Sequence, residues 1–186
     1  MTEEMLQEVR DLKRVADSDN IKFKQIIVDT LWQDPRIIHF INSTLLDESC
    51  PDEYIGTHIR KYYAIPEVQT SPENYIFVTC HYNEMPRYNS IEKYMQVTFQ
   101  ILCDVRTIEE EETGISRHDL LGAIILDIFN YSNIFGMQIH CISDQEGISD
   151  NEYVTRTLIF ESTTTNNILQ TRNKVTKVIN REPVRQ

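Results

Sequence analysis

The most informative segment of this 186-residue chain is residues 94–105, Tyr-Met-Gln-Val-Thr-Phe-Gln-Ile-Leu-Cys-Asp-Val. Apolar residues occupy every odd position from 95 to 105, and most of the even positions between them are polar. A period of two is typical of a β-strand that has one face in the core and the other in water. We therefore predict a long strand with one buried and one wet face.

Three further segments are predicted to join the same sheet. Residues 75–82 are rich in aromatic and β-branched side chains, and a turn region near 84–90 separates them from the first strand. This arrangement favours an antiparallel pair. Residues 137–143 and 153–161 are interpreted as a second pair, joined by a polar turn around 145–151. The expected sheet is four-stranded and mostly antiparallel.

Helices are expected before the first strand pair and between the two pairs. Helices that pack on an antiparallel sheet make an α+β fold, which is the predicted class. Ser116 followed by Asp119 resembles a capping box at the start of the helix between the pairs. Apolar spacing predicts helices at 3–16, from Asp19 or Asn20 to the Asp34-Pro35 pair, at 37–41, and from Ser116 to Asn133.

We expect a single α+β domain over residues 1–165, which begins with a helix within 1–18. A long irregular connection is predicted over 42–74, where several prolines argue against continuous helix. A connection of this length without regular structure is usually functional or held by a partner. Residues 166–186 are predicted to form a basic C-terminal arm.

The charge of the chain is strongly acidic overall, with a formal net charge of −11. From Thr163 onward there are five basic residues and one acidic residue, so this part carries +4 and the remainder −15. An acidic surface repels nucleic acid. The basic part is either a solvated tail or an arm that docks on an acidic neighbour, such as another copy of the chain.

No apolar run approaches the length needed to cross a bilayer, and the acidic N-terminus does not resemble a signal peptide. We therefore expect synthesis in the cytoplasm and no membrane partner. The composition also excludes collagen, coiled coil and disorder as descriptions of the whole chain.

The cysteines do not suggest a disulfide framework or a metal site. In a chain with no secretion signal we expect them to be reduced. The adjacent pairs Cys80-His81 and His140-Cys141 lie on predicted strands, where neighbouring side chains point to opposite faces. Each pair then offers one ligand per face, so no metal is expected. The four cysteines are Cys50, Cys80, Cys103 and Cys141.

Enzyme motifs are also missing from the sequence. It contains no glycine-rich phosphate loop, no nucleophile elbow and no nuclease pattern with paired acids and a lysine. In Arg117-His118-Asp119, adjacent helical residues lie about 100° apart and do not share a face. We predict that Asp119 favours the helix N-terminus and that the other two make surface contacts. No catalytic residue and no cofactor are expected.

Four consecutive acidic residues precede this helix: Glu109, Glu110, Glu111 and Glu112. Four adjacent carboxylates cannot all be buried, and Thr113-Gly114 follows them directly. We predict a solvated loop at this position.

Several segments together resemble the head–tail connector proteins of tailed bacteriophages, most closely the tail-terminator or tail-completion type. The resemblance covers roughly residues 20–165 and depends on pattern and order. It is carried by Leu31-Trp32-Gln33-Asp34-Pro35, Tyr54-Ile55-Gly56, the segment 59–66 (Ile-Arg-Lys-Tyr-Tyr-Ala-Ile-Pro), 114–121 (Gly-Ile-Ser-Arg-His-Asp-Leu-Leu), 129–136 (Phe-Asn-Tyr-Ser-Asn-Ile-Phe-Gly) and 156–161 (Arg-Thr-Leu-Ile-Phe-Glu).

The resemblance implies a structural protein of the virion neck. Such a protein forms a ring, usually of six copies, that ends the tail tube and joins it to the head. The implied partners are the copies of the ring, an adjacent neck or portal-side protein and the tail-tube protein, with DNA as passing cargo.

A ring suggests where the chain contacts its neighbours. We predict contacts to other copies through Tyr62, Tyr63 and Arg117 and through the arm residues Arg172, Lys174 and Lys177. The run Glu109–Glu112 is predicted to face the channel, where negative charge repels the DNA phosphates, and a plain solvated loop is the alternative.

Two other classes of protein stay open at this point. One is a small hydrolase or nuclease, which needs a cleft of convergent polar groups. The other is a monomeric regulatory module with one exposed groove. Oligomeric state separates both from a ring.

Overall fold

The structure is a computed structural model. It describes residues 3, 5–7, 19–64, 71–84, 92–149 and 152–165. The predicted helix within 1–18 and the predicted arm at 166–186 lie largely or wholly outside these ranges. Among the described residues, no helix combines the length and apolar character needed to cross a membrane.

Five strands form one mixed sheet in the order β1-β2-β3-β5-β4. All the long pairings are antiparallel, and the two-residue β1 alone runs parallel to its neighbour β2. The predicted α+β class is confirmed. The sheet has one strand more than predicted, because β1 is too short to produce an alternating sequence pattern. The bounds are β1 Ile59–Arg60, β2 Tyr75–Glu84, β3 Glu92–Asp104, β4 His140–Ile148 and β5 Tyr153–Thr165.

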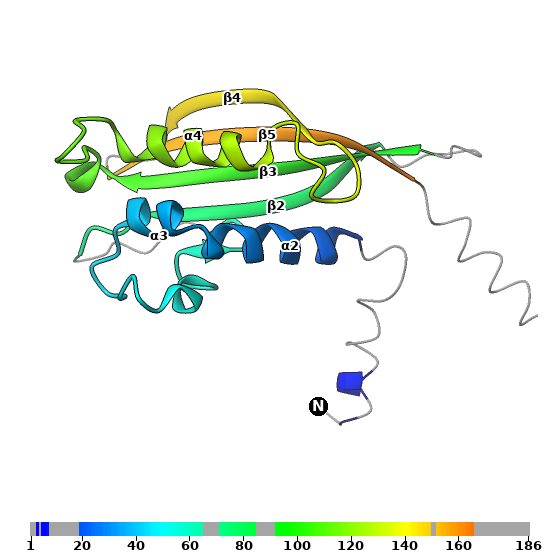
Figure 1. Cartoon of the computed structure of the whole chain (residues 1–186), viewed down its shortest axis with the longest axis horizontal. Coiled ribbons are helices and arrows are strands. Elements are labelled where there is room, and N and C mark those ends of the chain that lie inside the picture. The colour runs from blue at the N-terminus through cyan, green and yellow to red at the C-terminus, as the bar shows by residue number, and fades with distance from the viewer. Residues whose placement is uncertain are drawn as a thin grey trace, which may run out of the picture.

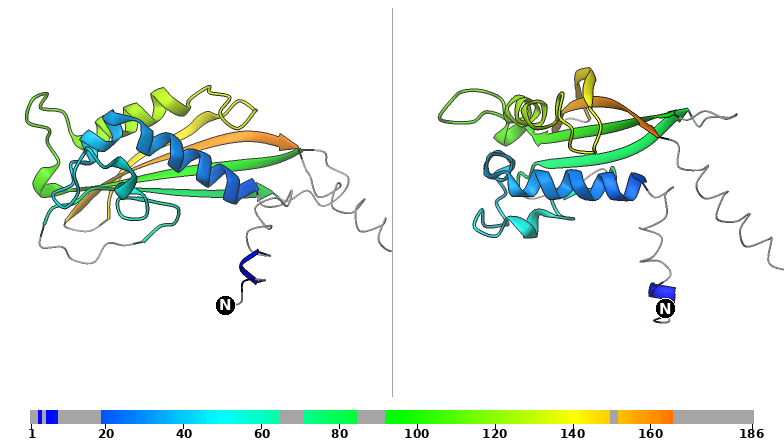
Figure 2. Two further views of the ribbon diagram at one scale, coloured as in Figure 1. Left: turned by 60° about the horizontal axis from the view of Figure 1, so that its bottom comes forward. Right: turned by 45° about the vertical axis from the view of Figure 1, so that its right-hand side comes forward.

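The helices pack on one face of this sheet (Figures 1 and 2). Helix α2 (Asp19–Gln33) crosses β2, and α4 (Arg117–Phe129) covers β3 and β5. The short helix α3 (Pro35–Ile41) lies between α2 and α4 and contacts both. Two 3-10 turns complete the described elements, η2 at Pro51–Tyr54 and η3 at Val105–Thr107.

Local sequence signals set the ends of α3. The Asp34 side chain accepts a hydrogen bond from the backbone N–H of Arg36 (2.9 Å), and Pro35 occupies the first helical position, where a missing N–H costs nothing. Asn42 ends the helix in the left-handed conformation (φ 48°).

The start of α4 differs from the predicted capping box. The helix begins after Ser116, as expected, but the Ser116 side chain makes no capping bond to the backbone. Its hydroxyl instead donates to the carboxylate of Asp119. Ser116 therefore holds the carboxylate of Asp119 at the first turn of α4.

Three aromatic rings form the centre of the core between α4 and the sheet. Phe99 on β3 lies with its ring centroid 4.9 Å from that of Phe129 on α4 and 5.4 Å from that of Phe160 on β5. All three residues are fully buried. The alternating pattern of residues 95–103 therefore faces this core, as predicted.

Some strand limits differ from the prediction. Val105 lies in η3 and is 45% exposed, because β3 ends at Asp104. β4 begins at His140 and continues to Ile148, so it occupies much of the predicted polar turn. This strand was underestimated because it lies at the sheet edge, where its side chains are largely polar and exposed.

The connection after α3 is held by the chain's own core, at least over residues 42–64 and 71–74. Tyr54 in η2 and Ile59 in β1 are fully buried. The described part of the connection packs under α2 and beside β2, so contacts within the chain hold it. A functional role for this connection stays a prediction.

Candidate functional site

The sheet face opposite the helices is polar across its middle. In register, Thr98 of β3 pairs with Ile159 of β5, and Gln100 pairs with Thr157. β4 extends the row, with Gln145 beside Thr157. Among the described side chains that β3, β4 and β5 present on this face, none is Lys or Arg. This surface, named the open face, consists of Thr79, His81, Gln96, Thr98, Gln100, His140, Ser143, Gln145, Thr157, Ile159 and Glu161.

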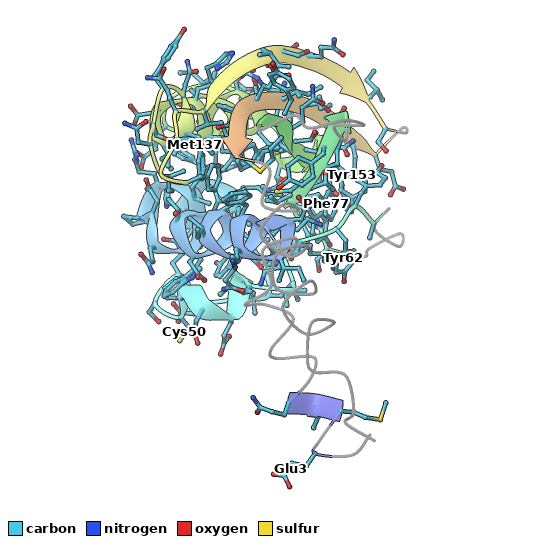
Figure 3. The ribbon with its side chains drawn as sticks, turned by 90° about the vertical axis from the view of Figure 1, so that its right-hand side faces the viewer. Glu3, Cys50, Tyr62, Phe77, Met137 and Tyr153 are labelled. Carbon is cyan, nitrogen blue, oxygen red and sulfur yellow. The ribbon has the colours of Figure 1, made fainter. Side chains whose placement is uncertain are left out.

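One end of the same side of the sheet is apolar. Tyr75, Phe77, Leu102 and Tyr153 form a second, smaller buried cluster, which Ala64 partly covers. Figure 3 looks along the strands and shows Tyr62, Phe77 and Tyr153 on the same side of the molecule. The predicted wet face is thus confirmed for the middle of the sheet and corrected at this end.

Two of the predicted contact residues lie beside this smaller cluster. Tyr63 packs edge-on against Phe77, with ring centroids 5.4 Å apart, and is still 43% exposed. Tyr62 is 57% exposed. Arg60 places its guanidinium 5.3 Å from the centre of the Tyr75 ring. Because Tyr63 is already held against Phe77, its exposed part can contact a partner at a low cost in side-chain entropy. The arm residues Arg172, Lys174 and Lys177 lie outside the described residues.

Both edges of the sheet are open within the described chain. β4 pairs with β5 alone, and β2 has its parallel partner only at Ile76 and Phe77. β4 also carries two exposed isoleucines, Ile142 (47% exposed) and Ile148 (76% exposed). An open edge with exposed apolar side chains favours pairing with another chain.

The acidic run is only partly solvated. Glu109, Glu111 and Glu112 are exposed, but Glu110 is 7% exposed. The Glu110 carboxylate accepts hydrogen bonds from the N–H and hydroxyl of Thr113, both at 2.8 Å. These bonds lower the pKa of Glu110. The prediction of four solvated carboxylates is therefore wrong for Glu110, which closes the turn before α4.

The prediction of surface contacts for Arg117 and His118 is also wrong. Arg117 is 8% exposed, and its Nε donates to the carbonyl of Thr107 (2.9 Å). His118 is 7% exposed. Arg117 is covered because the chain after η3 runs back to the start of α4, where the N–H of Arg117 donates to the carbonyl of Ile108 (2.6 Å). Arg117 therefore offers little surface to a neighbouring copy.

The structure brings His118 and Asp119 together with Glu146 of β4. One possible ligand atom from each of the three side chains lies within 4.8 Å of the others. The hydroxyl of Ser116 and, more weakly, the charges of His118 and Arg156 lower the pKa of Asp119. This cluster was missed in the sequence because Glu146 is 27 residues away and reaches Asp119 only through the packing of α4 on the sheet edge.

Arg156 of β5 connects the same region to the edge strand. Its guanidinium bonds to Asp119 (2.9 Å) and to Asp144 of β4 (2.7 Å). It fits against α4 because residue 122 is glycine: a Cβ there would lie 2.8 Å from the Arg156 side chain. The absent side chain of Gly122 thus makes room for the guanidinium.

A second polar cluster, named the clasp, fastens the connection after α3 to the sheet. Asn74, fully buried, donates from its side chain to the carbonyl of Ile41 (2.8 Å) and accepts from the N–H of Asp104 (3.0 Å). The ring of His58 bonds to the carbonyl of Asn74 (2.9 Å). The clasp therefore joins the end of α3, the residue before β1, the residue before β2 and the end of β3 at one point.

Ser43, His58 and Glu73 lie in the same region and superficially suggest a hydrolase. Ser43 Oγ is 3.0 Å from His58 Nε2, which is 3.5 Å from Glu73 Oε2. Ser43 Oγ, however, accepts bonds from the N–H groups of the next turn, and Glu73 holds Thr44. His58 and Glu73 are buried, so these groups stabilise the connection in this structure.

Burial of His58 predicts a pH dependence of stability. Removal from water, the largest influence, lowers the pKa of His58 below its usual 6.5. Neutral His58 fits its buried position, so its full contribution to the stability of the folded chain is present above about pH 6.5. This contribution is lost as the pH falls through the folded-state pKa of His58. We expect the unfolding free energy to fall as the pH drops below about 6.5, by at most about 1.4 kcal/mol per pH unit for one proton. Urea titrations at several pH values measure this slope.

The matched variants for this prediction are His58→Gln and His140→Gln. The first removes the buried imidazole and should flatten the slope, whereas the second changes an exposed ring. Equal slopes in the wild type and in His58→Gln would show that His58 is not responsible.

The four cysteines are free thiols, as predicted. Cys80 and Cys103 are buried and act as small apolar residues of the core. Burial raises the pKa of Cys80 to about 12. His81, its neighbour, is exposed on the other face, in agreement with the predicted alternation.

A scan of protein-family models matches residues 34–162 to the YomW family. The match begins at the cap of α3, ends in β5 and includes the clasp, the open face and the cluster at α4. The chain belongs to the YomW family. This family is phage-associated, which agrees with the broader part of the resemblance seen in the sequence. Helix α2 precedes the YomW match. A search of curated proteins finds no match to the chain.

Proposed function

We propose that this YomW-family protein is a structural component of the phage neck. In this proposal it forms a ring that ends the tail tube, joins the tube to the head and leaves a channel for DNA. The observation that carries the proposal is the open face: a wide polar sheet surface that no described helix covers and that lacks Lys and Arg across β3, β4 and β5.

A channel for DNA needs a wall that does not bind phosphate. Affinity for DNA comes largely from Lys and Arg at the phosphates. The open face offers hydroxyls and amides together with the carboxylate of Glu161, and the whole chain carries −11. The exposed acidic residues Glu109, Glu111 and Glu112 add further negative charge. Such a wall lets DNA slide.

A closed ring also needs two different surfaces that fit each other. The free edge of β4 and the free part of β2 lie toward opposite edges of one sheet. Pairing of β4 in one copy with β2 in the next copy would extend the sheet around the ring. Tyr62 and Tyr63 supply anchored aromatic area beside the β1 end. The charge contrast between the acidic body and the basic residues Arg172, Lys174 and Lys177 favours docking of the arm on the next copy.

Oligomeric state tests the proposal directly. Multi-angle light scattering and negative-stain imaging of the purified full chain should show a closed ring, with six copies as the expected number. The double variant Ile142→Glu with Ile148→Glu should give monomers, because it places charge on the free edge of β4 without changing the core. Leu45→Glu alters an equally exposed residue away from the edge and is the control.

A compact monomer at high protein concentration, in both the full chain and a variant truncated after Thr165, would contradict the ring. That result would favour the enzyme or regulatory-module interpretations. If the ring persists in the double β4 variant but is lost in Tyr62→Ala with Tyr63→Ala, the proposal of a ring stands. The contact between copies then lies at the β1 end of the sheet.

A further inference from the structure

We propose that His118, Asp119 and Glu146 form a binding site for a divalent transition-metal ion such as Zn²⁺. The site lies where the first turn of α4 meets the edge strand β4, away from the open face. The inference is independent of the proposed neck function.

The first observation is the state of the His118 ring. The side chain is about nine-tenths buried, and Nδ1 has no hydrogen-bond partner among the described residues. Nε2 faces Asp119 Oδ1 at 3.7 Å, which is beyond hydrogen-bonding distance. Nδ1 is therefore a buried polar atom whose lost solvation the described residues do not replace, and a bound ion can supply a partner for such an atom.

The second observation is the approach of two acidic side chains. One side-chain oxygen of Glu146 lies within 4.8 Å of the facing atoms of Asp119 and His118. Two carboxylates this close repel each other, and a shared cation relieves the repulsion. Arg156 already supplies one positive charge to Asp119. Because the His118 ring lies beside the same pair, the three groups surround one point from α4 and β4.

The distances are close to those of a metal centre. The three ligand atoms lie within 4.8 Å of one another, and His118 Nε2 and Asp119 Oδ1 are 3.7 Å apart. Two ligands of a tetrahedral Zn²⁺ lie about 3.4 Å apart at bond lengths near 2.1 Å. Glu146 is exposed on an edge strand, so its side chain can move to close the remaining gap.

The local charge also favours a cation. Asp119, Asp144 and Glu146 supply three carboxylates, and Arg156 is the cation bonded to this group. The three carboxylates and the guanidinium of Arg156 together carry a formal net charge of −2. Arg156 and Ser116 each donate one hydrogen bond to the Asp119 side chain. A carboxylate has about four lone-pair positions, so positions remain for a metal ion.

The ligand set selects the type of metal. One imidazole and two carboxylates suit Zn²⁺ and other borderline transition metals, whereas Mg²⁺ prefers oxygen ligands alone. A bound ion would connect the N-terminus of α4 to β4, whose only described strand partner is β5. The site would therefore add a second link between α4 and β4, beside the one that Arg156 makes.

Calorimetric titration of Zn²⁺ into metal-stripped full-length protein tests the site. We use a Cys50→Ser background, because Cys50 is an exposed thiol that can bind zinc by itself. One ion should bind per chain, and His118→Ala and Glu146→Gln should each weaken binding at least tenfold. His140→Ala alters an exposed histidine at the start of the same strand and should leave the affinity unchanged.

Thermal unfolding gives a second readout that does not depend on heat signals. A ligand that binds only the folded chain raises the melting temperature as its concentration rises. Zn²⁺ should raise the melting temperature of the Cys50→Ser protein and of His140→Ala, but not that of Glu146→Gln, whose exposed side chain is not needed for folding. Three results would each overturn the site: zinc binding in His118→Ala and Glu146→Gln as strong as in the Cys50→Ser protein, binding of Mg²⁺ as strong as that of Zn²⁺, or no zinc binding.

Discussion

Replacing Phe99 with alanine is expected to lower the free energy of unfolding by about 3–5 kcal/mol. Phe99 is fully buried in the centre of β3 and contacts Phe129 of α4 and Phe160 of β5. Its removal leaves a cavity between helix and sheet that the two remaining rings can fill only in part. Urea denaturation, followed by circular dichroism, measures the change.

The matched control is the next residue in the same strand. Thr98 lies on the open face between Thr79 and Ile159, so Thr98→Ala should cost less than about 1 kcal/mol. The pair tests the assignment of the two sheet faces as well as the packing. Similar losses for Phe99→Ala and Thr98→Ala would contradict the described orientation of β3.

Replacing Asn74 with alanine should cost about 2–4 kcal/mol, the second large effect. The side chain serves two buried backbone groups, the carbonyl of Ile41 and the N–H of Asp104. Each group left without a partner costs about 1–3 kcal/mol. The variant also loosens the point at which α3, β2 and β3 meet, so we expect the connection after α3 to open before global unfolding. Urea denaturation and amide hydrogen exchange measure the two effects.

Two further variants sharpen this prediction. Asn74→Asp keeps the shape but removes the donor to Ile41, and it should be at least as destabilising as alanine because it buries a charge. Asn133→Ala changes an exposed asparagine in the turn after α4 and should have little effect. A loss of less than about 0.5 kcal/mol in Asn74→Ala would show that the clasp does not hold the connection.

Much of the fold could be predicted because several signals are local. The alternation around residues 95–103 defined β3 and its buried face. The Asp34-Pro35 pair marked the boundary between α2 and α3, and Ser116 the start of α4. These features depend on neighbours within a few residues, so a single sequence contains them.

The errors share a different cause. β1 and the far half of β4 exist because another strand lies beside them, and their own residues show little alternation. Glu110 is buried because Thr113 supplies hydrogen bonds that satisfy its carboxylate. Residue type alone predicted an exposed Glu110. In the folded turn, the hydrogen bonds from Thr113 allow the side chain to be buried.

The amino-acid sequence was sufficient for the α+β class, the amphipathic central strand, the acidic charge of the chain and the resemblance to phage proteins. Periodicity and composition are properties of the chain itself. The open face, the clasp and the approach of Glu146 to His118 and Asp119 arise only after folding. These features bring together residues that lie from 12 to several tens of positions apart. Their proximity depends on how α4 and the edge strands pack on the sheet.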